Sequence, residues 1–277
     1  MLRPVEEDDV LVARAASGDR AAFTEVVARH GPAVRRVARA ITGDDALADD
    51  VTQDALVAAM RAASTYRADA GSVRTWLLTI ARNTAKRARR RPREEPRGEL
   101  DDAALMALGL DAGWGREGPE LSFEHAEQLE ALARAVASLP EEDREIIVLR
   151  DVEQLPGEDA AQLIGLTLAA MKSRLHRARL RLLAALREGD RSVVEKERTV
   201  GGLTCAQVLA QLGDYVDGEL TPADVARVDG HLRGCTVCER FGGRYSRVVR
   251  AARARLGAPV TFDDALVDAI RARLEQG

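Results

Sequence analysis

Three cysteines and a histidine in the last third of the chain have the spacing of metal ligands. His231 and Cys235 are four residues apart, and Cys238 follows three residues later, so a helix end and the turn after it bring the three side chains together. With Cys205 upstream, they supply three sulfurs and one nitrogen, the closed tetrahedral donor set that suits structural Zn²⁺. The chain holds only 3 cysteines, too few for a disulfide framework. The sequence therefore predicts a zinc site, and the alternative is three buried or redox-active thiols without metal.

The predicted zinc site is of the structural rather than the catalytic kind. Four protein ligands close the coordination shell, and no Asp or Glu sits beside an open position. Thr221-Pro222 and Asp224 provide the N-terminal cap of the helix that is expected to carry His231. We therefore expect a small helical module held together by zinc, in a protein that is not an enzyme.

A second group of chemically active side chains lies on a predicted helix-turn-helix. A short helix is predicted at 158–164, Gly165 makes the turn, and a longer helix follows at 168–183. The buried stripe of the longer helix is Leu168, Met171, Leu175, Ala178 and Leu182. The residues suited to reading bases in a major groove are Lys172, Ser173, His176 and Arg177, with Arg174 and Arg179 placed for flanking phosphates. The alternative is a basic amphipathic helix that packs on its own domain.

Charge is distributed unevenly along the chain, although the formal net charge is only −4. The charged residues of segment 44–54 are all acidic, whereas segment 61–91 is strongly basic and has Asp69 as its one acid. Such asymmetry implies separate acidic and basic surfaces, and a basic surface can meet phosphate. The alternative is that both segments are ordinary solvated helix faces.

The composition favours helices over sheets. Hydrophobic residues make up 46% of the 277 residues but aromatic residues only 3%, so Ala, Leu and Val must build the cores, which suits small helical bundles. We therefore expect an all-α fold with two small helical domains and a small helical Cys/His module. The expected segments are a helical domain at 8–91, a flexible acidic linker at 92–124, a second helical domain at 125–188, a hinge at 189–203, the Cys/His module at 204–243 and a helical tail at 244–277. Shorter helices within them are expected at 103–108, 245–256 and 262–274.

The sequence lacks the signs of a secreted or membrane-bound protein. The first residues contain no apolar core of a signal peptide, and no apolar run approaches the roughly 20 residues that span a bilayer. We therefore expect a cytoplasmic protein without membrane contact.

Two blocks of sequence resemble the extracytoplasmic-function (ECF) sigma factors of RNA polymerase. LPEEDREIIVLRDV at 139–152 and MKSRLHRAR at 171–179 resemble region four of this family, which reads the promoter −35 element. DDVTQDAL at 49–56 resembles the region-two helix that docks on the polymerase β′ clamp. RTWLLTIARN at 74–83 resembles the segment that melts and reads the −10 element. The first helical domain is thus expected to be region two, and the second region four.

The resemblance implies roles for individual residues of region two. The residues expected to bind polymerase are Asp50, Gln53 and Asp54, and those expected to bind promoter DNA are Arg82, Asn83, Lys86 and Arg90. Asn83 matches a position near the pocket for an unstacked base, and the three basic residues are expected to follow the DNA backbone. Trp76 is interpreted instead as part of the apolar stripe of its helix.

The Cys/His module resembles the zinc-binding anti-sigma domain, through YVDGEL at 215–220 and HLRGCTVC at 231–238. The usual anti-sigma factor is a separate protein, whereas this module is fused to the sigma domains. We therefore expect an intramolecular contact that masks the sigma domains, in which Arg247, Arg250 and Arg253 meet the acidic docking helix.

Together these patterns predict a sigma factor that binds core RNA polymerase at its β′ clamp and β flap, recognises promoter DNA and initiates transcription under the control of its own zinc module. The alternative, from another class, is a metal- or redox-sensing helix-turn-helix regulator that is not a polymerase subunit. The docking helix and the melting segment favour the sigma factor, because a simple repressor needs neither. Two departures leave promoter preference open: Arg87 stands where the family usually has an acid, and TLAA at 167–170 replaces the usual turn before the reading helix.

Overall fold

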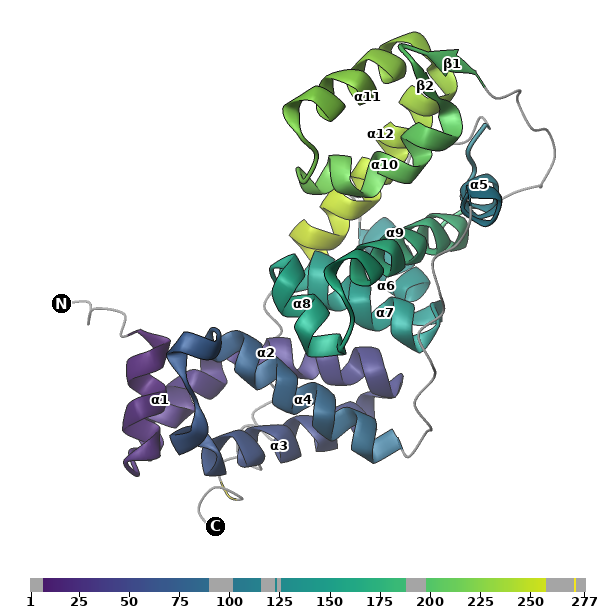
Figure 1. Ribbon diagram of the computed structural model, residues 1–277. Coiled ribbons are helices and arrows are strands. Elements are labelled where there is room, and N and C mark those ends of the chain that lie inside the picture. The colour runs from purple at the N-terminus through teal and green to yellow at the C-terminus, as the bar shows by residue number, and fades with distance from the viewer. Residues whose placement is uncertain are drawn as a thin grey trace. The chain divides into compact units, whose positions relative to one another are not determined.

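The computed structural model describes residues 7–89, 102–115, 123, 126–187, 198–257 and 272. These residues form helices joined by short turns, together with one two-stranded hairpin, so the all-α prediction is confirmed (Figure 1). The chain divides into two compact units. The first unit comprises Met1–Glu94 with Ala258–Gly277, and the second comprises Glu95–Gly257.

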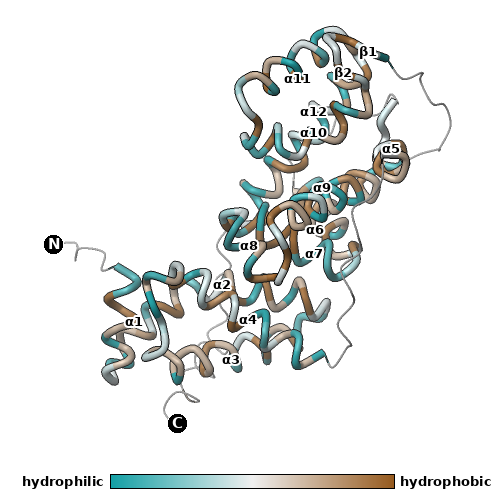
Figure 2. Tube along the Cα trace, viewed as in Figure 1, coloured by the Kyte–Doolittle hydropathy of each residue, from teal (hydrophilic) through white to brown (hydrophobic). Residues whose placement is uncertain are grey.

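The first unit is a helical bundle in its described part. Its elements are α1 (Asp8–Ala16), α2 (Arg20–Thr42), α3 (Asp45–Arg61), the 3-10 turns η1 (Ala63–Thr65) and η2 (Ala68–Ala70), and α4 (Val73–Arg89). Asp19 caps α2 by accepting a hydrogen bond from the Ala22 N–H, and Asp44 caps α3 in the same way. Apolar and polar residues alternate along these helices, and the buried residues of α2, α3 and α4 form the core (Figure 2).

The helix-turn-helix lies in the second unit. Its elements are α6 (Ala126–Ser138), α7 (Glu141–Ile147), the π-helical turn η3 (Val148–Val152), α8 (Gly157–Ile164) and α9 (Leu168–Ala185). Gly165 ends α8 with a φ of 74°, a left-handed conformation that favours glycine, and the Thr167 side chain caps α9. The predicted stripe on α9 is buried except for Leu168, which is 38% exposed.

A helix from the segment expected to be a linker also belongs to the second unit. Helix α5 (Asp102–Asp111) contains the short helix that was expected at 103–108. It lies against α9 and α10, and in the turn that follows it the Trp114 side chain is buried. This part of the expected linker is therefore a packed element.

The Cys/His module completes the second unit. Its elements are the antiparallel hairpin of β1 (Thr199–Val200) and β2 (Leu203–Thr204), then α10 (Cys205–Asp217), α11 (Pro222–Gly234), α12 (Thr236–Ala251) and the π-helical turn η4 (Ala252–Leu256). Thr204 and Gln207 form a capping box at the start of α10. The hairpin begins within the expected hinge and ends at the first residue of the expected module, and α12 runs through the boundary expected at 243 and 244. The helix expected at 262–274 lies outside the described residues, except for the single helical residue 272.

Candidate functional site

The four predicted metal ligands come together in the module. Cys205 is the first residue of α10, His231 lies near the end of α11, Cys235 separates α11 from α12, and Cys238 is in the first turn of α12. Their ligand atoms all lie within 4.8 Å of one another, and all four residues are buried. Residues far apart in sequence thus form one compact cluster of three sulfurs and one nitrogen.

The histidine of this cluster is oriented for a metal ion. Its Nδ1 lies 3.0 Å from the Leu203 carbonyl oxygen and 3.2 Å from the Val200 carbonyl oxygen. Because carbonyls only accept, Nδ1 carries the proton, and the lone pair is on Nε2. The Nε2 atom of His231 is buried and has no hydrogen-bond partner among the described residues. This is the arrangement in which a histidine ligand is held by its other ring nitrogen.

The spacing of the sulfurs also fits a metal better than a disulfide. The Cys205 and Cys235 sulfurs are 3.9 Å apart. Tetrahedral zinc with Zn–S bonds of about 2.3 Å places two sulfurs roughly 3.8 Å apart, whereas a disulfide requires about 2.05 Å. Burial raises the pKa of the Cys205 and Cys238 thiols. Thiolates in this buried position are therefore stable only beside a cation.

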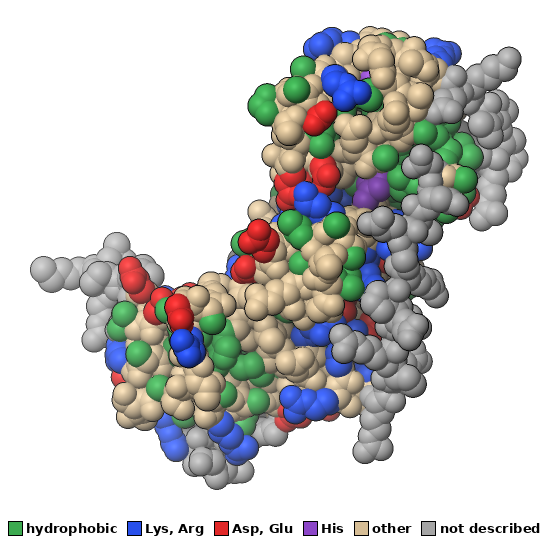
Figure 3. Space-filling view, viewed as in Figure 1, with side chains coloured by type: hydrophobic (Ala, Val, Ile, Leu, Met, Phe, Trp, Pro, Cys, Tyr) green, Lys and Arg blue, Asp and Glu red, His purple; other side chains and the backbone are tan. Residues whose placement is uncertain are grey.

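The face of α9 that is predicted to read bases is covered by the module. The Lys172 Nζ lies 2.6 Å from a Glu219 carboxylate oxygen and 3.4 Å from an Asp214 carboxylate oxygen. The His176 Nδ1 is hydrogen-bonded to the Tyr245 hydroxyl at 3.0 Å, and His176 is only 8% exposed. Figure 3 shows acidic and basic side chains side by side where the module meets the helix-turn-helix. This face is therefore an interface inside the second unit.

A buried ion network lies beside this interface. Arg179 is 1% exposed, and its Nη2 lies 2.6 Å from Asp151 and 2.8 Å from Asp217. Arg253 of η4 pairs with the same two carboxylates. Burial raises the pKa of Asp217, but the charges and hydrogen bonds of Arg179 and Arg253 together outweigh burial, so the pKa lies below its usual range. The network therefore links α9 and η3 of the helix-turn-helix region to α10 and η4 of the module through ion pairs.

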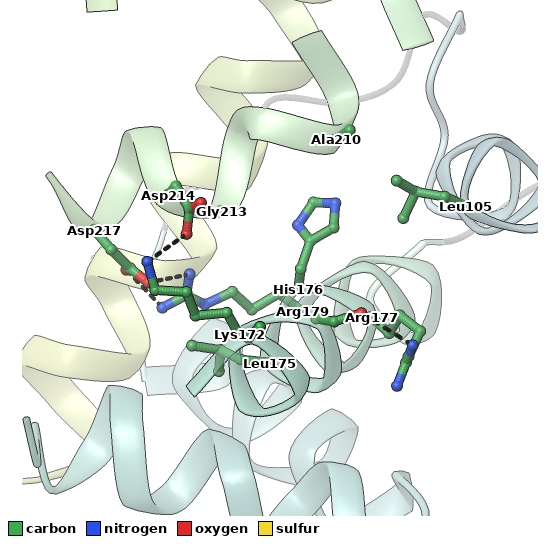
Figure 4. A pocket seen from close by; sticks show the side chains of 12 residues that line it. Leu105, Lys172, Leu175, His176, Arg177, Arg179, Ala210, Gly213, Asp214 and Asp217 are labelled. Carbon is green, nitrogen blue, oxygen red and sulfur yellow. Dashed lines mark hydrogen bonds and ion pairs between the residues drawn. The ribbon is translucent and has the colours of Figure 1, made fainter. Parts of the chain in front are cut away.

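The other residues of α9 that are predicted to contact DNA also make contacts inside the second unit. Arg174 lies 3.2 Å from a Glu142 carboxylate oxygen, and the Arg177 guanidinium donates to the Ser173 hydroxyl at 3.1 Å. A cavity of about 290 Å³ runs between α9 and α10 and is lined by both sides of the interface (Figure 4). Side chains predicted to meet DNA thus make contacts within the protein, and their role in DNA binding stays a prediction.

The predicted polymerase- and DNA-binding residues of the first unit are arranged differently. Asp50 and Asp54 of α3 are exposed and Gln53 is half-buried. Asn83 of α4 is exposed, whereas Arg82 and Lys86 are half-buried, and Arg90 lies outside the described residues.

Trp76, also in the first unit, was interpreted as an apolar stripe residue. It is half-buried, with its ring centroid 5.4 Å from that of Tyr66. It thus lies at the edge of the core rather than inside it.

Sequence reasoning did not single out the residues that cover α9. Asp214, Asp217 and Glu219 occupy the end of α10 and the turn after it, where they lie opposite the cations of α9. The available signal was the cluster of acids in DYVDGE, because it is complementary to the basic reading helix. Trp114 was also missed, although a lone tryptophan in a glycine-rich stretch is an unusual feature.

Comparison with known proteins agrees with this architecture. The sequence matches the Sigma-70 region 2 family over residues 26–95, the Sigma-70, region 4 family over residues 129–182 and a zinc-finger family over residues 205–238. Fold and site together thus define a sigma-70-type protein with an added Cys/His module that fits an anti-sigma-like domain. Among the described residues, no helix is long and apolar enough to cross a membrane.

Several curated sigma factors are similar to this chain. The RNA polymerase sigma factor CnrH of Cupriavidus metallidurans is 33% identical over 192 residues, which are 67% of this chain and 97% of that protein. The ECF RNA polymerase sigma factor SigM of Mycobacterium tuberculosis is 32% identical over 187 residues, 66% of this chain and 87% of that protein. The ECF RNA polymerase sigma-E factor of Escherichia coli is 34% identical over 180 residues, 62% of this chain and 90% of that protein.

The chain therefore belongs to the ECF family of RNA polymerase sigma factors, and it is a sigma factor for transcription initiation. The alternative of a regulator that is not a polymerase subunit is not favoured, because both sigma regions are present in order.

Proposed function

We propose that this sigma factor carries its own inhibitor: the Cys/His module binds Zn²⁺ and keeps the promoter-reading helix covered. Cys205, His231, Cys235 and Cys238 would hold the ion, which would supply a fixed cross-link between α10, α11 and α12. The buried, unpartnered Nε2 of His231 supports a metal at this position. Without the ion, so small a module has little core of its own to keep these helices together.

The observation that carries the proposal is the position of α9. The carboxylates of Asp214, Asp217 and Glu219 neutralise cations that DNA phosphates would neutralise in a promoter complex. In the same interface His176 is turned toward Tyr245 rather than toward solvent. A promoter −35 element can bind this face only after α10 and α12 have moved away. Because the module is tethered, even a modest contact is enough to compete with DNA.

One of the three arginines expected to contact the acidic docking helix has other partners. The sequence suggested that Arg247, Arg250 and Arg253 meet the acidic docking helix. Arg253 instead pairs with Asp151 and Asp217 inside the second unit. We therefore assign inhibition to the cover over region four.

Region two would bind polymerase and promoter DNA whether or not the module covers α9. Asp50, Gln53 and Asp54 are proposed to dock on the β′ clamp of core RNA polymerase, and region four on the β flap. Arg82, Asn83, Lys86 and Arg90 are proposed to hold the −10 strand. The exposure of Asp50, Asp54 and Asn83 supports this assignment.

The test weakens the cover without touching region four. In the full chain, Asp214→Asn/Glu219→Gln removes the partners of Lys172 from the module side of the interface. The control Asp224→Asn/Glu239→Gln makes the same charge change elsewhere on the module, where Asp224 pairs only locally with Arg227 and Glu239 is exposed. Transcription with core polymerase and affinity for −35 DNA are measured for both variants. We expect a several-fold gain in both for the first variant only, and equal behaviour of the two variants would contradict the cover.

A further inference from the structure

Helix α5 and the turn after it form a third partner in the contact between α9 and the module. We call residues 102–115 the interregion segment, because they lie between the two sigma regions in the chain. Helix α5 packs against both α9 and α10. Figure 4 shows Leu105 on the α5 side of the cavity between these helices, and His176 and Arg177 on the α9 side. The interregion segment therefore borders the residues of α9 that are predicted to read bases.

The contact between α5 and α10 is closest at a glycine. Gly109 is buried, and an added Cβ there would lie 2.4 Å from the Leu209 Cδ2 of α10. Leu209 is itself only 2% exposed, so its side chain has little room to move aside. Glycine destabilises a helix interior relative to alanine. A glycine at this position is thus a disadvantage for α5 alone and an advantage only when α5 is docked.

Two arginines hold the end of the interregion segment by its backbone carbonyls. The Arg187 Nη1, just after α9, donates to the Asp111 carbonyl at 2.9 Å. The Arg244 Nη2 of α12 donates to the Gly113 carbonyl at 2.6 Å, in a buried position. Gly113 has a φ of +93°, and a Cβ there would lie 3.0 Å from the Arg187 Cδ and 3.3 Å from the Arg244 Nη2. The turn therefore fits between one arginine beside α9 and one arginine of the module.

These contacts connect the interregion segment to both sides of the cover. If the module moved away from α9, Leu209 and Arg244 would leave with the module, whereas Arg187 would stay beside α9. The segment would then lose at least one set of its partners. A buried carbonyl such as that of Gly113 is costly to leave without its donor. Opening the cover is therefore harder when the segment is docked than when it is not.

We propose that the interregion segment is a latch that holds the module over α9, so that the promoter-reading face is uncovered when this segment undocks. The proposal rests on the proposed function, because a latch needs the cover that it holds. It adds an element that precedes region four in the chain to the module that follows it. If undocking of the segment favours DNA binding, then DNA binding favours undocking by the same factor.

The first test crowds the docking site of α5 without changing α9 or the module. In the full chain, Gly109→Gln places a side chain against Leu209, whereas the control Ala107→Gln places the same side chain at an exposed position of the same helix. Glutamine is a better helix former than glycine, so a loss of helix propensity cannot explain undocking. We expect Gly109→Gln to bind −35 DNA about 5-fold more tightly, a factor at the low end for overpacked contacts. Ala107→Gln should bind it like the parent.

The Asp214→Asn/Glu219→Gln variant distinguishes failure of the latch from failure of the cover. Tighter DNA binding in this variant, with parental or weaker binding in Gly109→Gln, would overturn the latch and leave the cover standing. Parental binding in both variants would refute the cover and the latch with it.

The second test measures the segment itself in chains whose α5 is unchanged, so it does not depend on how Gly109→Gln folds. Hydrogen exchange of the α5 amides is compared in the parent, in the parent saturated with −35 DNA and in Asp214→Asn/Glu219→Gln. Helix α5 has 10 residues, too few for a stable isolated helix, so its amides exchange rapidly once it undocks. We expect exchange about 5-fold faster or more in both opened states, and parental exchange in Asp224→Asn/Glu239→Gln. Unchanged exchange in α5 when DNA is bound would show that the segment stays docked while α9 is uncovered, and would overturn the latch.

Discussion

The predicted binding residues of region two and region four are equally polar but differ in accessibility. In region two, Asp50, Asp54 and Asn83 are exposed on their helices. In region four, His176 and Arg179 are buried under elements that follow them in the chain. The difference teaches that a fused module can cover predicted binding residues in one half of a two-part recognition protein while those in the other half stay exposed.

The same comparison separates two kinds of charge. The carboxylates on α3 that are predicted to bind polymerase lie at the surface, where screening by water and salt keeps interactions weak until a partner excludes solvent. The carboxylates of Asp151 and Asp217, which pair with Arg179, have already been desolvated together with their partner. Opening the module therefore requires either an equally good set of anions, such as DNA phosphates, or the loss of the module's own fold.

The largest effect is expected from removing the metal ligands. Structural zinc contributes roughly 10–16 kcal/mol in small zinc-finger peptides at neutral pH, so Cys235→Ala/Cys238→Ala should unfold the module. Affinity for −35 DNA should then rise, while binding of core polymerase through region two should stay the same. Fluorescence anisotropy with promoter DNA and co-purification with polymerase measure the two halves separately. If DNA affinity stays at the parental level, the module is not the cover; a fall would indicate that it assists DNA binding.

The next effect in size is expected in the buried ion network. Asp151→Ala removes a carboxylate that Arg179 and Arg253 share. Breaking a buried pair typically costs about 3–5 kcal/mol, so the thermal transition of the second unit should fall clearly. Asp69→Ala in the first unit removes the exposed partner of Arg67 and serves as the control, and its thermal transition should stay close to that of the parent because exposed ion pairs contribute little to stability. Similar losses in both variants would show that the network is not a buried contact in solution.

Substitutions in the predicted polymerase-docking surface test whether region two is accessible to polymerase. Reversing Asp50 and Asp54 to Lys should weaken binding of core polymerase by about 2–5 kcal/mol, because desolvated charge pairs lose this much when one partner is removed. The loss should be the same in the full chain and in Cys235→Ala/Cys238→Ala, since the exposed acids lie outside the cover. Circular dichroism serves as the control for helical content. Unchanged polymerase binding would remove these residues from the docking surface.

The smallest effect is expected in the pH dependence of the stability of the second unit. Burial, followed by the charges of Arg179 and Arg177, lowers the pKa of His176 from 6.5 to about 4. The His176 ring is therefore neutral in the folded chain. The contribution of this neutral ring to stability is complete above pH 6.5 and is lost as the pH falls toward 4. Between pH 6.5 and 5 the loss is about 2 kcal/mol, at 1.36 kcal/mol per pH unit.

His176→Asn isolates this contribution from other acid-sensitive groups, such as the metal ligands. Urea unfolding of the second unit is compared at pH 7, 6 and 5 for the parent and the variant. The parent should lose more stability than the variant over this range. Parallel pH profiles would mean that His176 is already accessible to water in solution.

Much of the fold and of the metal cluster was predictable from local sequence. The helix-turn-helix follows from the apolar spacing on α9 and from Gly165, and the four metal ligands follow from residue type and spacing. Local patterns also indicated that the reading face of α9 is polar and basic. They did not show that Asp214 and Asp217 neutralise it, because that pairing joins residues far apart in the chain.

The segment between the sigma regions shows a second limit of local patterns. Its glycines and acids are typical of a linker, and the sequence predicted one. Gly109 and Gly113 instead allow close approach to Leu209 and Arg187. A glycine selected for space cannot be told from one selected for flexibility until its neighbours in the fold are known.

The order of elements along the chain has a consequence for newly made protein. Helices α10 and α12, which cover α9, both follow it, and Cys238 is the last of the four ligands to be added. Ribosomes add about 5–20 residues per second, so the region-four segment is complete several seconds before the metal cluster can close. Each new molecule therefore begins with an uncovered α9, and the time needed to translate the remaining residues sets the minimum length of that interval.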